Sequence, residues 1–301
     1  MTEPLEALRK YVHDLRERDG VKEVRLSRAA QQGLARLAAA IKAFPDSAPD
    51  AKTPSPEPAR NSVPVKEQSS PPRKPVTHLV TPSVIDGPPL EITGSTKAEQ
   101  LKHLAERASV CMKCPHLATR RHNVVFGVGN PDAKLMFVGE APGEEEDLKG
   151  EPFVGRAGQL LTKMIIAMGL TREQVYIGNI VKCRPDMPQG VPGNRKPTKQ
   201  EMETCVPYLR AQIEVIKPTA MVALGATAVE GLIGPVGTIG SLRGKFMEYR
   251  GVPLMPTYHP SYLLRNQSNT EKRKVWEDLL KVMERLEMPI SEKQRGFFLA
   301  K

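Results

Sequence analysis

The C-terminal two thirds of the chain alternate between short apolar runs and longer segments with helical periodicity. Short apolar runs are typical of buried strands, and they occupy residues 134–138, 175–181, 220–224 and 254–258. Helices are expected between them, over 157–170, from 198 towards 216, from about 227, and over 270–286. Strands that alternate with helices predict a mostly parallel, four-stranded sheet that is covered on both faces.

The helix that begins near residue 198 has the clearest start signal. Thr198 and Glu201 have the spacing of a capping box, in which each side chain accepts a hydrogen bond from the other residue's backbone. The same helix contains Pro207, and we expect this proline to kink the helix or to shift its start because it has no backbone N–H.

The remaining segments suggest how the chain is divided. Residues 1–44 carry apolar residues at helical spacing, but two short helices cannot form a stable core alone. We expect a helical extension that docks on the main domain or, alternatively, binds a partner. Residues 45–96 are predicted to be a disordered linker, since positions 45–89 hold 12 prolines and no aromatic residue. A single α/β domain then spans 97–288, and a C-terminal tail spans 289–301.

Composition narrows the classes of function. Lys and Arg number 44 against 34 Asp and Glu among 301 residues, a net charge of +10 that favours a polyanionic partner only modestly. No apolar run approaches the length of a membrane span, and the charged N-terminus lacks the apolar core of a secretory signal. We therefore expect a cytoplasmic protein without a membrane partner.

Unusual side chains follow the predicted strands. Glu140 comes directly after the first strand, Asn179 lies near the end of the second, and His259 follows the fourth. Each residue alone has an ordinary structural explanation. In open α/β sheets, however, ligands bind outside the carboxyl ends of the strands, so these three side chains are expected to meet in one crevice.

The four cysteines suggest a metal site. Cys111 and Cys114 form a C-x-x-C pair before the sheet, Cys183 follows the second strand, and Cys205 lies on the next helix. In the cytosol such thiols are more often ligands than disulfides. Zinc and a [4Fe–4S] cluster both accept four thiolates. The spacing modestly favours the cluster, because zinc sites usually have two short C-x-x-C pairs.

Charged residues gather around the same crevice. Five cations lie between 182 and 199, namely Lys182, Arg184, Arg195, Lys196 and Lys199, and Arg265 follows the fourth strand. They form either a solvated loop or a rim that contacts phosphates. The acidic run 144–147 is expected to provide a carboxylate-rich floor.

Several motifs occur together in the main domain, in the order Gly139-Glu-Ala-Pro-Gly-Glu-Glu-Glu-Asp147, Glu151-Pro-Phe-Val-Gly155, Asn179-Ile-Val-Lys-Cys-Arg-Pro185, Asn194-Arg-Lys-Pro197 and Tyr258-His-Pro-Ser-Tyr-Leu-Leu-Arg265. With the four cysteines, they closely resemble the family 4 uracil-DNA glycosylases, the iron–sulfur type, over residues 98–288. The resemblance implies a three-layer α/β/α sandwich. It also implies a [4Fe–4S] cluster, with zinc as the alternative, on Cys111, Cys114, Cys183 and Cys205.

The resemblance assigns roles to individual residues. Asn179 is expected to read the edge of uracil, Phe153 to stack on the flipped base, and His259 to face uracil O2. Glu140 is expected to line the floor of the pocket, and Glu146 to lie near uracil C5, where it would clash with the methyl group of thymine.

A second group of residues is expected to bind the substrate around that pocket. The backbone of Ala141 and Gly143 lines the floor, and Arg195, Ser261, Leu263 and Arg265 complete the substrate-binding set. The apolar wedge that enters the duplex is expected at Leu263 or Leu264.

The expected function is therefore DNA repair. The protein would flip uracil out of single- or double-stranded DNA and hydrolyse its N-glycosidic bond, leaving an abasic site. The alternatives are a glycosylase for a broader range of deaminated bases, and a non-catalytic iron–sulfur protein that binds DNA or senses redox state. We expect a monomer, with the N-terminal helices as a candidate tether to replication or repair partners.

The sequence departs from the family pattern in one loop. The segment between Cys183 and Asn194 is longer than the usual link, which puts the geometry of this loop in doubt. A related branch that bonds covalently to uracil-DNA carries a histidine in this region. No histidine lies between His122 and His259 here, which argues against that branch.

Overall fold

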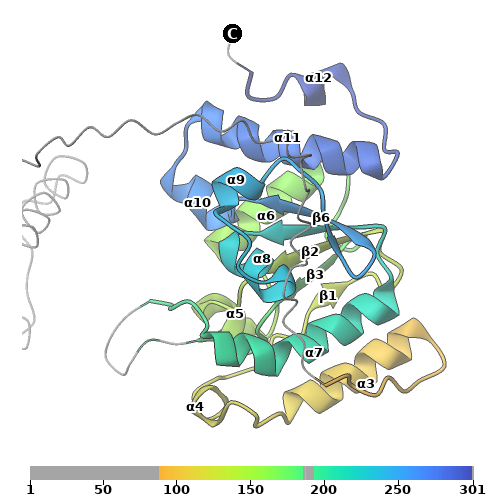
Figure 1. Ribbon diagram of the computed structural model, residues 1–301, viewed down its shortest axis with the longest axis vertical. Coiled ribbons are helices and arrows are strands. Elements are labelled where there is room, and N and C mark those ends of the chain that lie inside the picture. Colours follow the sequence, from red (N-terminus) through yellow and green to blue (C-terminus); the bar gives the residue numbers. More distant parts are fainter. Residues whose placement is uncertain (1–87, 186, 188–192, 300–301) are drawn as a thin grey trace, which may run out of the picture. The chain divides into compact units, whose positions relative to one another are not determined.

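A computed structural model describes residues 88–185, 187 and 193–299 (Figure 1). The predicted helical extension over 1–44 and most of the predicted linker over 45–96 lie outside these residues, so both stay predictions. The described chain begins as coil, and its Leu90 and Ile92 already pack against the core of the domain.

The sheet has six strands in the order β1-β3-β2-β4-β6-β5. Their bounds are β1 Val128–Gly129, β2 Leu135–Gly139, β3 Tyr176–Asn179, β4 Ala220–Leu224, β5 Met247–Tyr249 and β6 Val252–Thr257. The four central strands are parallel and correspond to the four predicted runs. The predicted number of four was wrong, because β1 and β5 add antiparallel edges that are too short for a periodic pattern.

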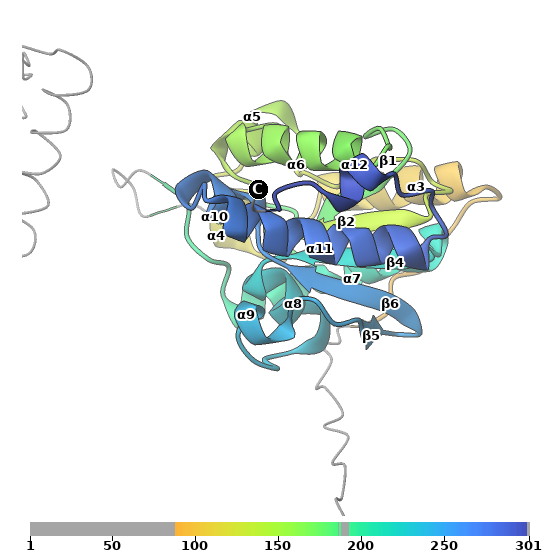
Figure 2. The ribbon, with the colours of Figure 1, turned by 90° about the horizontal axis from the view of Figure 1, so that it is seen from above.

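Helices cover both faces of the sheet, so the α/β/α sandwich is confirmed. On one face, α3 (Lys97–Ser109), α7 (Lys199–Ile216) and α8 (Ala226–Ile233) pack over one apolar cluster. On the other face, α6 (Arg156–Ala167) and α11 (Asn269–Arg285) pack over a second cluster. Figure 1 shows α11 above the sheet with α7 and α3 below it, and Figure 2 looks down onto α6 and α11.

The central strands contribute side chains to both clusters in alternation. Met136 and Val138 of β2 point into the first cluster, whereas Leu135 and Phe137 point into the second. A strand that is buried on both faces reads as a continuous apolar run, which is why the sequence marks these four strands so clearly.

The helix α7 starts as predicted and continues through its proline. The Thr198 hydroxyl accepts a hydrogen bond from the Glu201 backbone, and a Glu201 carboxylate oxygen accepts one from the Thr198 backbone, which completes the capping box. Pro207 neither shifts this start nor ends the helix, which runs on to Ile216. Buried side chains on both sides of Pro207 hold the helix in place.

The remaining helices of the described chain are short. They are α4 Pro115–Ala118, α5 Glu144–Lys149, α9 Ile239–Leu242, α10 Pro260–Arg265 and α12 Glu292–Arg295. The segment after residue 288, predicted to be a tail, is anchored because Trp276 Nε1 donates a hydrogen bond to the Gln294 carbonyl. No helix in the described part of the chain is both long and apolar enough to cross a membrane.

Candidate active site

A cavity of about 530 Å³ opens at the carboxyl ends of β2, β3, β4 and β6. This is the size of a typical small-molecule site. Ten of the eleven predicted catalytic and substrate-binding residues line it, namely Glu140, Ala141, Gly143, Glu146, Phe153, Asn179, Arg195, His259, Ser261 and Arg265. The exception is Leu263. The convergence expected from the strand ends is therefore present in the structure.

Asn179 is the last residue of β3 and pairs with Gly139, the last residue of β2. Its side chain is only 1% exposed, and its amide oxygen Oδ1 is buried without any hydrogen-bond partner. A β-carbon on Gly139 would lie 2.4 Å from this Oδ1 atom and 2.5 Å from Cζ of Phe153. Glycine is thus required at position 139 for both the amide oxygen and the phenyl ring to lie so close to the end of β2.

Phe153 adopts a left-handed backbone conformation, with φ of 54°, which is strained for a residue with a side chain. The Arg172 guanidinium donates hydrogen bonds to the carbonyls of Phe153 and Pro152, at 3.1 and 2.9 Å. Gly158 packs directly against the backbone of Phe153, where a β-carbon would lie 1.9 Å from its carbonyl oxygen. The surrounding contacts therefore hold the strained backbone and fix the ring at the cavity.

His259 is the N-cap of α10, and its hydrogen bonds define its tautomer. Nδ1 accepts a hydrogen bond from the Ser261 backbone N–H at 3.1 Å and lies 2.8 Å from the Ser261 hydroxyl. The ring proton of the neutral imidazole consequently sits on Nε2. The pKa of His259 is lowered to about 4, chiefly by burial and also by the charge of Arg265, while Glu146 opposes the shift. His259 is thus a neutral hydrogen-bond donor at physiological pH.

In the acidic run 144–147, which was expected at the floor of the crevice, Glu146 and Asp147 hold neighbouring loops together. The Glu146 carboxylate accepts backbone N–H bonds from Gly143, Val154 and Gly155 at 2.9–3.1 Å. Asp147 is fully buried and accepts hydrogen bonds from the His122 backbone and ring. Within this run only Glu146 lines the cavity, so its placement near uracil C5 stays a prediction.

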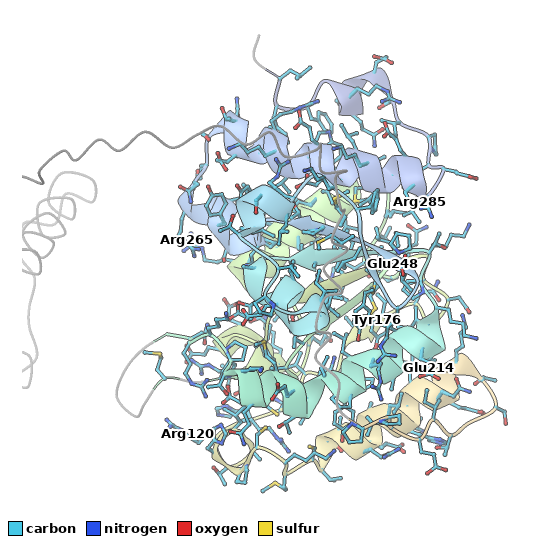
Figure 3. All side chains as sticks on the ribbon, in the orientation of Figure 1. Arg120, Tyr176, Glu214, Glu248, Arg265 and Arg285 are labelled. Atoms are coloured by element: carbon cyan, nitrogen blue, oxygen red, sulfur yellow. The ribbon has the colours of Figure 1, made fainter. Side chains whose placement is uncertain are left out.

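The cationic rim is smaller than expected. Lys182 is 1% exposed and lies in the core, so neither a solvated loop nor a phosphate-contacting rim describes this residue. Arg195 lines the cavity, but its guanidinium makes two hydrogen bonds, at 2.6 and 2.8 Å, with the buried carboxylate of Glu201. Arg265 is exposed at the end of α10 and remains available to a phosphate (Figure 3).

The two leucines of α10 differ in exposure. Leu263 is 5% exposed and packs in the apolar cluster between the sheet and the helices α6 and α11. Leu264 is only partly buried. Of the two leucines, Leu264 therefore has the more accessible side chain.

The four cysteines are all free thiols in the structure. Cys205 Sγ accepts a hydrogen bond from the Lys182 backbone N–H, and Cys183 Sγ accepts one from Arg121, both at 3.2 Å. The pKa of Cys205 is raised to about 12, chiefly by burial, with smaller increases from Cys183 and Cys114 and an opposing effect of Lys182. Electrostatic effects of this kind connect all four thiols. Among the described residues, however, no three Cys, His, Asp or Glu side chains have the arrangement of a metal site.

The number and type of the sulfur donors fit a four-thiolate group. Such a group requires deprotonated cysteines, and a bound cation lowers thiol pKa values that burial alone raises. N–H groups directed at two of the four sulfurs are the kind of outer-shell contact that stabilises thiolate ligands.

The roles of two residues near the site could not be predicted from the sequence. Arg172 holds the carbonyls beside the Phe153 ring from a turn that carries no motif. Lys182 lies within a motif, but its basic neighbours suggest an exposed side chain. Only the packing of α7 against β3 shows that Lys182 points into the core.

Comparisons with known proteins show which family the chain resembles. Residues 126–280 match the family described as the uracil DNA glycosylase superfamily. The chain is 49% identical over 188 residues to the type-4 uracil-DNA glycosylase of Thermotoga maritima, which covers 62% of this chain and 94% of the relative. It is 42% identical over 197 residues to the type-4 enzyme of Saccharolobus solfataricus, covering 62% and 87%. A type-5 uracil-DNA glycosylase of Pyrobaculum aerophilum is 31% identical over 185 residues, covering 51% and 79%.

Proposed function

The chain belongs to the uracil DNA glycosylase superfamily, and from this premise we propose that it hydrolyses the N-glycosidic bond of uracil in DNA, leaving an abasic site. The observation that carries the proposal is the buried, unpaired Oδ1 atom of Asn179 beside the Phe153 ring. Buried polar atoms are nearly always hydrogen-bonded in folded proteins. An orphaned acceptor at the wall of a cavity is therefore reserved for a donor that the substrate brings.

Uracil supplies that donor. The Asn179 amide can accept a hydrogen bond from uracil N3–H through Oδ1 and donate one to O4 through its NH₂ group. Cytosine presents the opposite pattern, an acceptor at N3 and a donor at N4. With cytosine, polar groups of both the Asn179 amide and the base would be buried without a partner, at a cost of about 1–3 kcal/mol for each group.

His259 is assigned to stabilise the leaving group. Cleavage of the glycosidic bond places negative charge on the uracil ring, largely at O2. A neutral imidazole with its proton on Nε2 can donate a hydrogen bond to this oxygen as the charge develops, which lowers the transition state more than the ground state. Glu140, which lines the cavity, is assigned to position the water that attacks C1′.

The base must leave the helix before these groups can act. Extrusion costs a few kcal/mol, and stacking on Phe153 together with an apolar wedge offsets this cost. Leu264 is the wedge that we favour, and Arg265 is positioned to contact a flanking phosphate. Single-stranded DNA needs no wedge, so both forms of DNA are proposed as substrates.

We further propose that Cys111, Cys114, Cys183 and Cys205 hold a [4Fe–4S] cluster. Four free thiols with two N–H donors directed at them support this group, and zinc is the alternative. When bound, the cluster would link the segment before the sheet, the segment after Asn179 and α7. We assign it a structural role. The protein is proposed to act as a monomer in the cytoplasm.

The test is the release of uracil from oligonucleotides by the purified protein without added metal. We expect a brown protein that releases uracil from single- and double-stranded DNA and leaves thymine in place. Release of hypoxanthine at a comparable rate would support the broader glycosylase. A brown protein that releases no base would support the DNA-binding or redox-sensing alternative. A colourless, active protein would contradict the cluster.

A further inference from the structure

Lys182 is a buried lysine that the proposed chemistry does not use. It is 1% exposed, and its ammonium group has two close oxygen acceptors. Nζ donates a hydrogen bond to the backbone carbonyl of Asn179 at 2.9 Å and another to Oε1 of Gln212 at 2.5 Å. A lysine is almost never buried without a partner, so this side chain has a specific place in the fold.

Gln212 extends the network along β3. It is fully buried on α7, and its Nε2 donates hydrogen bonds to the Phe126 carbonyl and to the Tyr176 hydroxyl, both at 2.9 Å. Tyr176 begins β3 and Asn179 ends it, so the network holds both ends of this strand from one side. Figure 3 shows Tyr176 between the sheet and α7.

The backbone of Lys182 is fixed as well. Its N–H donates to Cys205 Sγ at 3.2 Å, and its carbonyl accepts a hydrogen bond from the Val125 N–H at 2.8 Å. The side chain therefore extends from an anchored backbone towards Asn179, three residues earlier. Both an ammonium and a neutral amine have enough N–H groups for its two bonds, so the arrangement requires no particular charge on Lys182.

Asn179 needs such support because its Oδ1 atom has no protein partner. If Oδ1 is kept free for the base, hydrogen bonds to that atom cannot fix the direction of the side chain. The direction must then come from the packing around Gly139, where the Phe153 ring also lies, and from the backbone of residue 179 itself. The only side-chain donor recorded on this carbonyl in the described part of the chain is Lys182 Nζ.

We propose that Lys182 is a positioning residue that sets the direction of the Asn179 amide through its backbone carbonyl. The inference rests on the proposed function, and it adds Lys182 to the residues that determine the specificity for uracil. Without Lys182 the carbonyl of Asn179 and Oε1 of Gln212 would both be buried and unpaired, and the end of β3 would shift to find other partners. Displacement of a positioned group by about 1 Å can cost a factor of about 100 in rate.

The variant Lys182→Met tests this role, because methionine has a similar length and no donor. We expect kcat/KM for uracil-containing DNA to fall by about 10–100-fold, and inhibition by free uracil to weaken by a similar factor. The matched control is Leu279→Ala, which opens a cavity in the other apolar cluster and has no polar link to Asn179. It should lower the melting temperature without weakening inhibition by uracil.

A double-mutant cycle with Asn179→Ala separates positioning from general damage. If Lys182 acts through the amide, adding Lys182→Met to the Asn179→Ala variant should reduce kcat/KM by less than about twofold. The proposal is overturned if Lys182→Met lowers kcat/KM by the same factor in the Asn179→Ala protein as in the wild type. It is also overturned if Lys182→Met leaves inhibition by uracil unchanged.

The two proposals can fail separately. If wild-type protein releases no uracil, the proposed function fails, and no cycle is needed to show it. If the wild type is active but the cycle is additive, only the role of Lys182 fails.

Should Lys182→Met not fold, Gln212→Leu removes the second acceptor of Lys182, and the same cycle is run with that variant. It is expected to show a smaller loss that also disappears without the amide, and an additive loss would again overturn the proposal.

Discussion

The phenyl ring of Phe153 and the imidazole of His259 lie 5.7 Å apart, centroid to centroid, with their planes inclined by 33°. Phe153 follows β2 and His259 follows β6, so two distant segments meet at the cavity. One ring offers a stacking face and the other a hydrogen-bond donor. Both rings and the Asn179 amide line the same cavity, in which we propose that the base binds.

The first prediction concerns Gly139. In Gly139→Ala the new methyl group would collide with both the Asn179 amide oxygen and the Phe153 ring. We expect kcat/KM for uracil excision to fall by at least ~100-fold, because both groups must move. Gly240→Ala is the matched control, since its β-carbon would meet only the Tyr258 hydroxyl at 3.6 Å. Equal activity of the two variants in a uracil-release assay would show that the close approach at Gly139 has no catalytic importance.

The second prediction concerns the pH dependence of activity. The pKa of His259 is lowered to about 4, so the imidazole stays neutral over the range in which an ordinary histidine titrates. Protonation of His259 should therefore not reduce kcat/KM until the pH falls below about 5. A pH–rate profile measured on single-stranded substrate tests this. A loss of activity centred near pH 6.5 that disappears in His259→Gln would contradict the assignment.

The same histidine affects stability. Its pKa is about 4 in the folded chain and about 6.5 in the unfolded chain, so between these values the unfolded state binds more protons. The free energy of unfolding should thus fall as the pH decreases from about 6.5 to 4, and this contribution is fully present above 6.5. Urea denaturation of His259→Gln should show a shallower decrease than the wild type. Parallel curves for the two proteins would be evidence that burial does not shift this histidine.

The third prediction separates the two leucines of α10. Leu263→Ala removes a buried core side chain and should lower the free energy of unfolding by about 2–5 kcal/mol. Leu264→Ala should leave stability nearly unchanged and reduce excision from double-stranded DNA by about tenfold, with little effect on single strands. The ratio of double- to single-strand activity is the measurement. If this ratio falls in Leu263→Ala alone, the wedge has been assigned to the wrong leucine.

The fourth prediction concerns the cysteines. Cys183→Ser is expected to reduce the visible absorbance of the protein and to lower its melting temperature, because the cluster is assigned to link segments that are far apart in sequence. Activity should be lost in parallel with folded protein. A variant that melts like the wild type but no longer releases uracil would indicate a direct catalytic role for the cluster.

Sequence alone located the parts of the site that lie at strand ends. The four central strands are buried on both faces, so their apolar runs were visible, and Asn179 and His259 could be placed at one edge of the sheet. The family resemblance then supplied the chemistry. The short strands β1 and β5 carry too few residues for any periodic signal.

Other features depend on tertiary packing and could not be predicted. The left-handed backbone of Phe153 is held by Arg172, and no local pattern encodes that contact. Lys182 was expected in a basic loop or rim and Asp147 in the floor of the crevice, yet both are buried with polar partners. The sequence does not show whether a charged side chain is buried or exposed. That depends on whether the fold provides polar partners for it in the core.

Asn179 provides the most direct test of the central claim. Single-turnover release of the base should be measured on single-stranded oligonucleotides that contain one uracil or one cytosine, with wild-type protein and with Asn179→Ala. We predict that the wild type releases uracil and not cytosine, and that Asn179→Ala loses a factor of about 100 or more while keeping its fold. Uracil release by Asn179→Ala at the wild-type rate would contradict the claim that this amide reads the base.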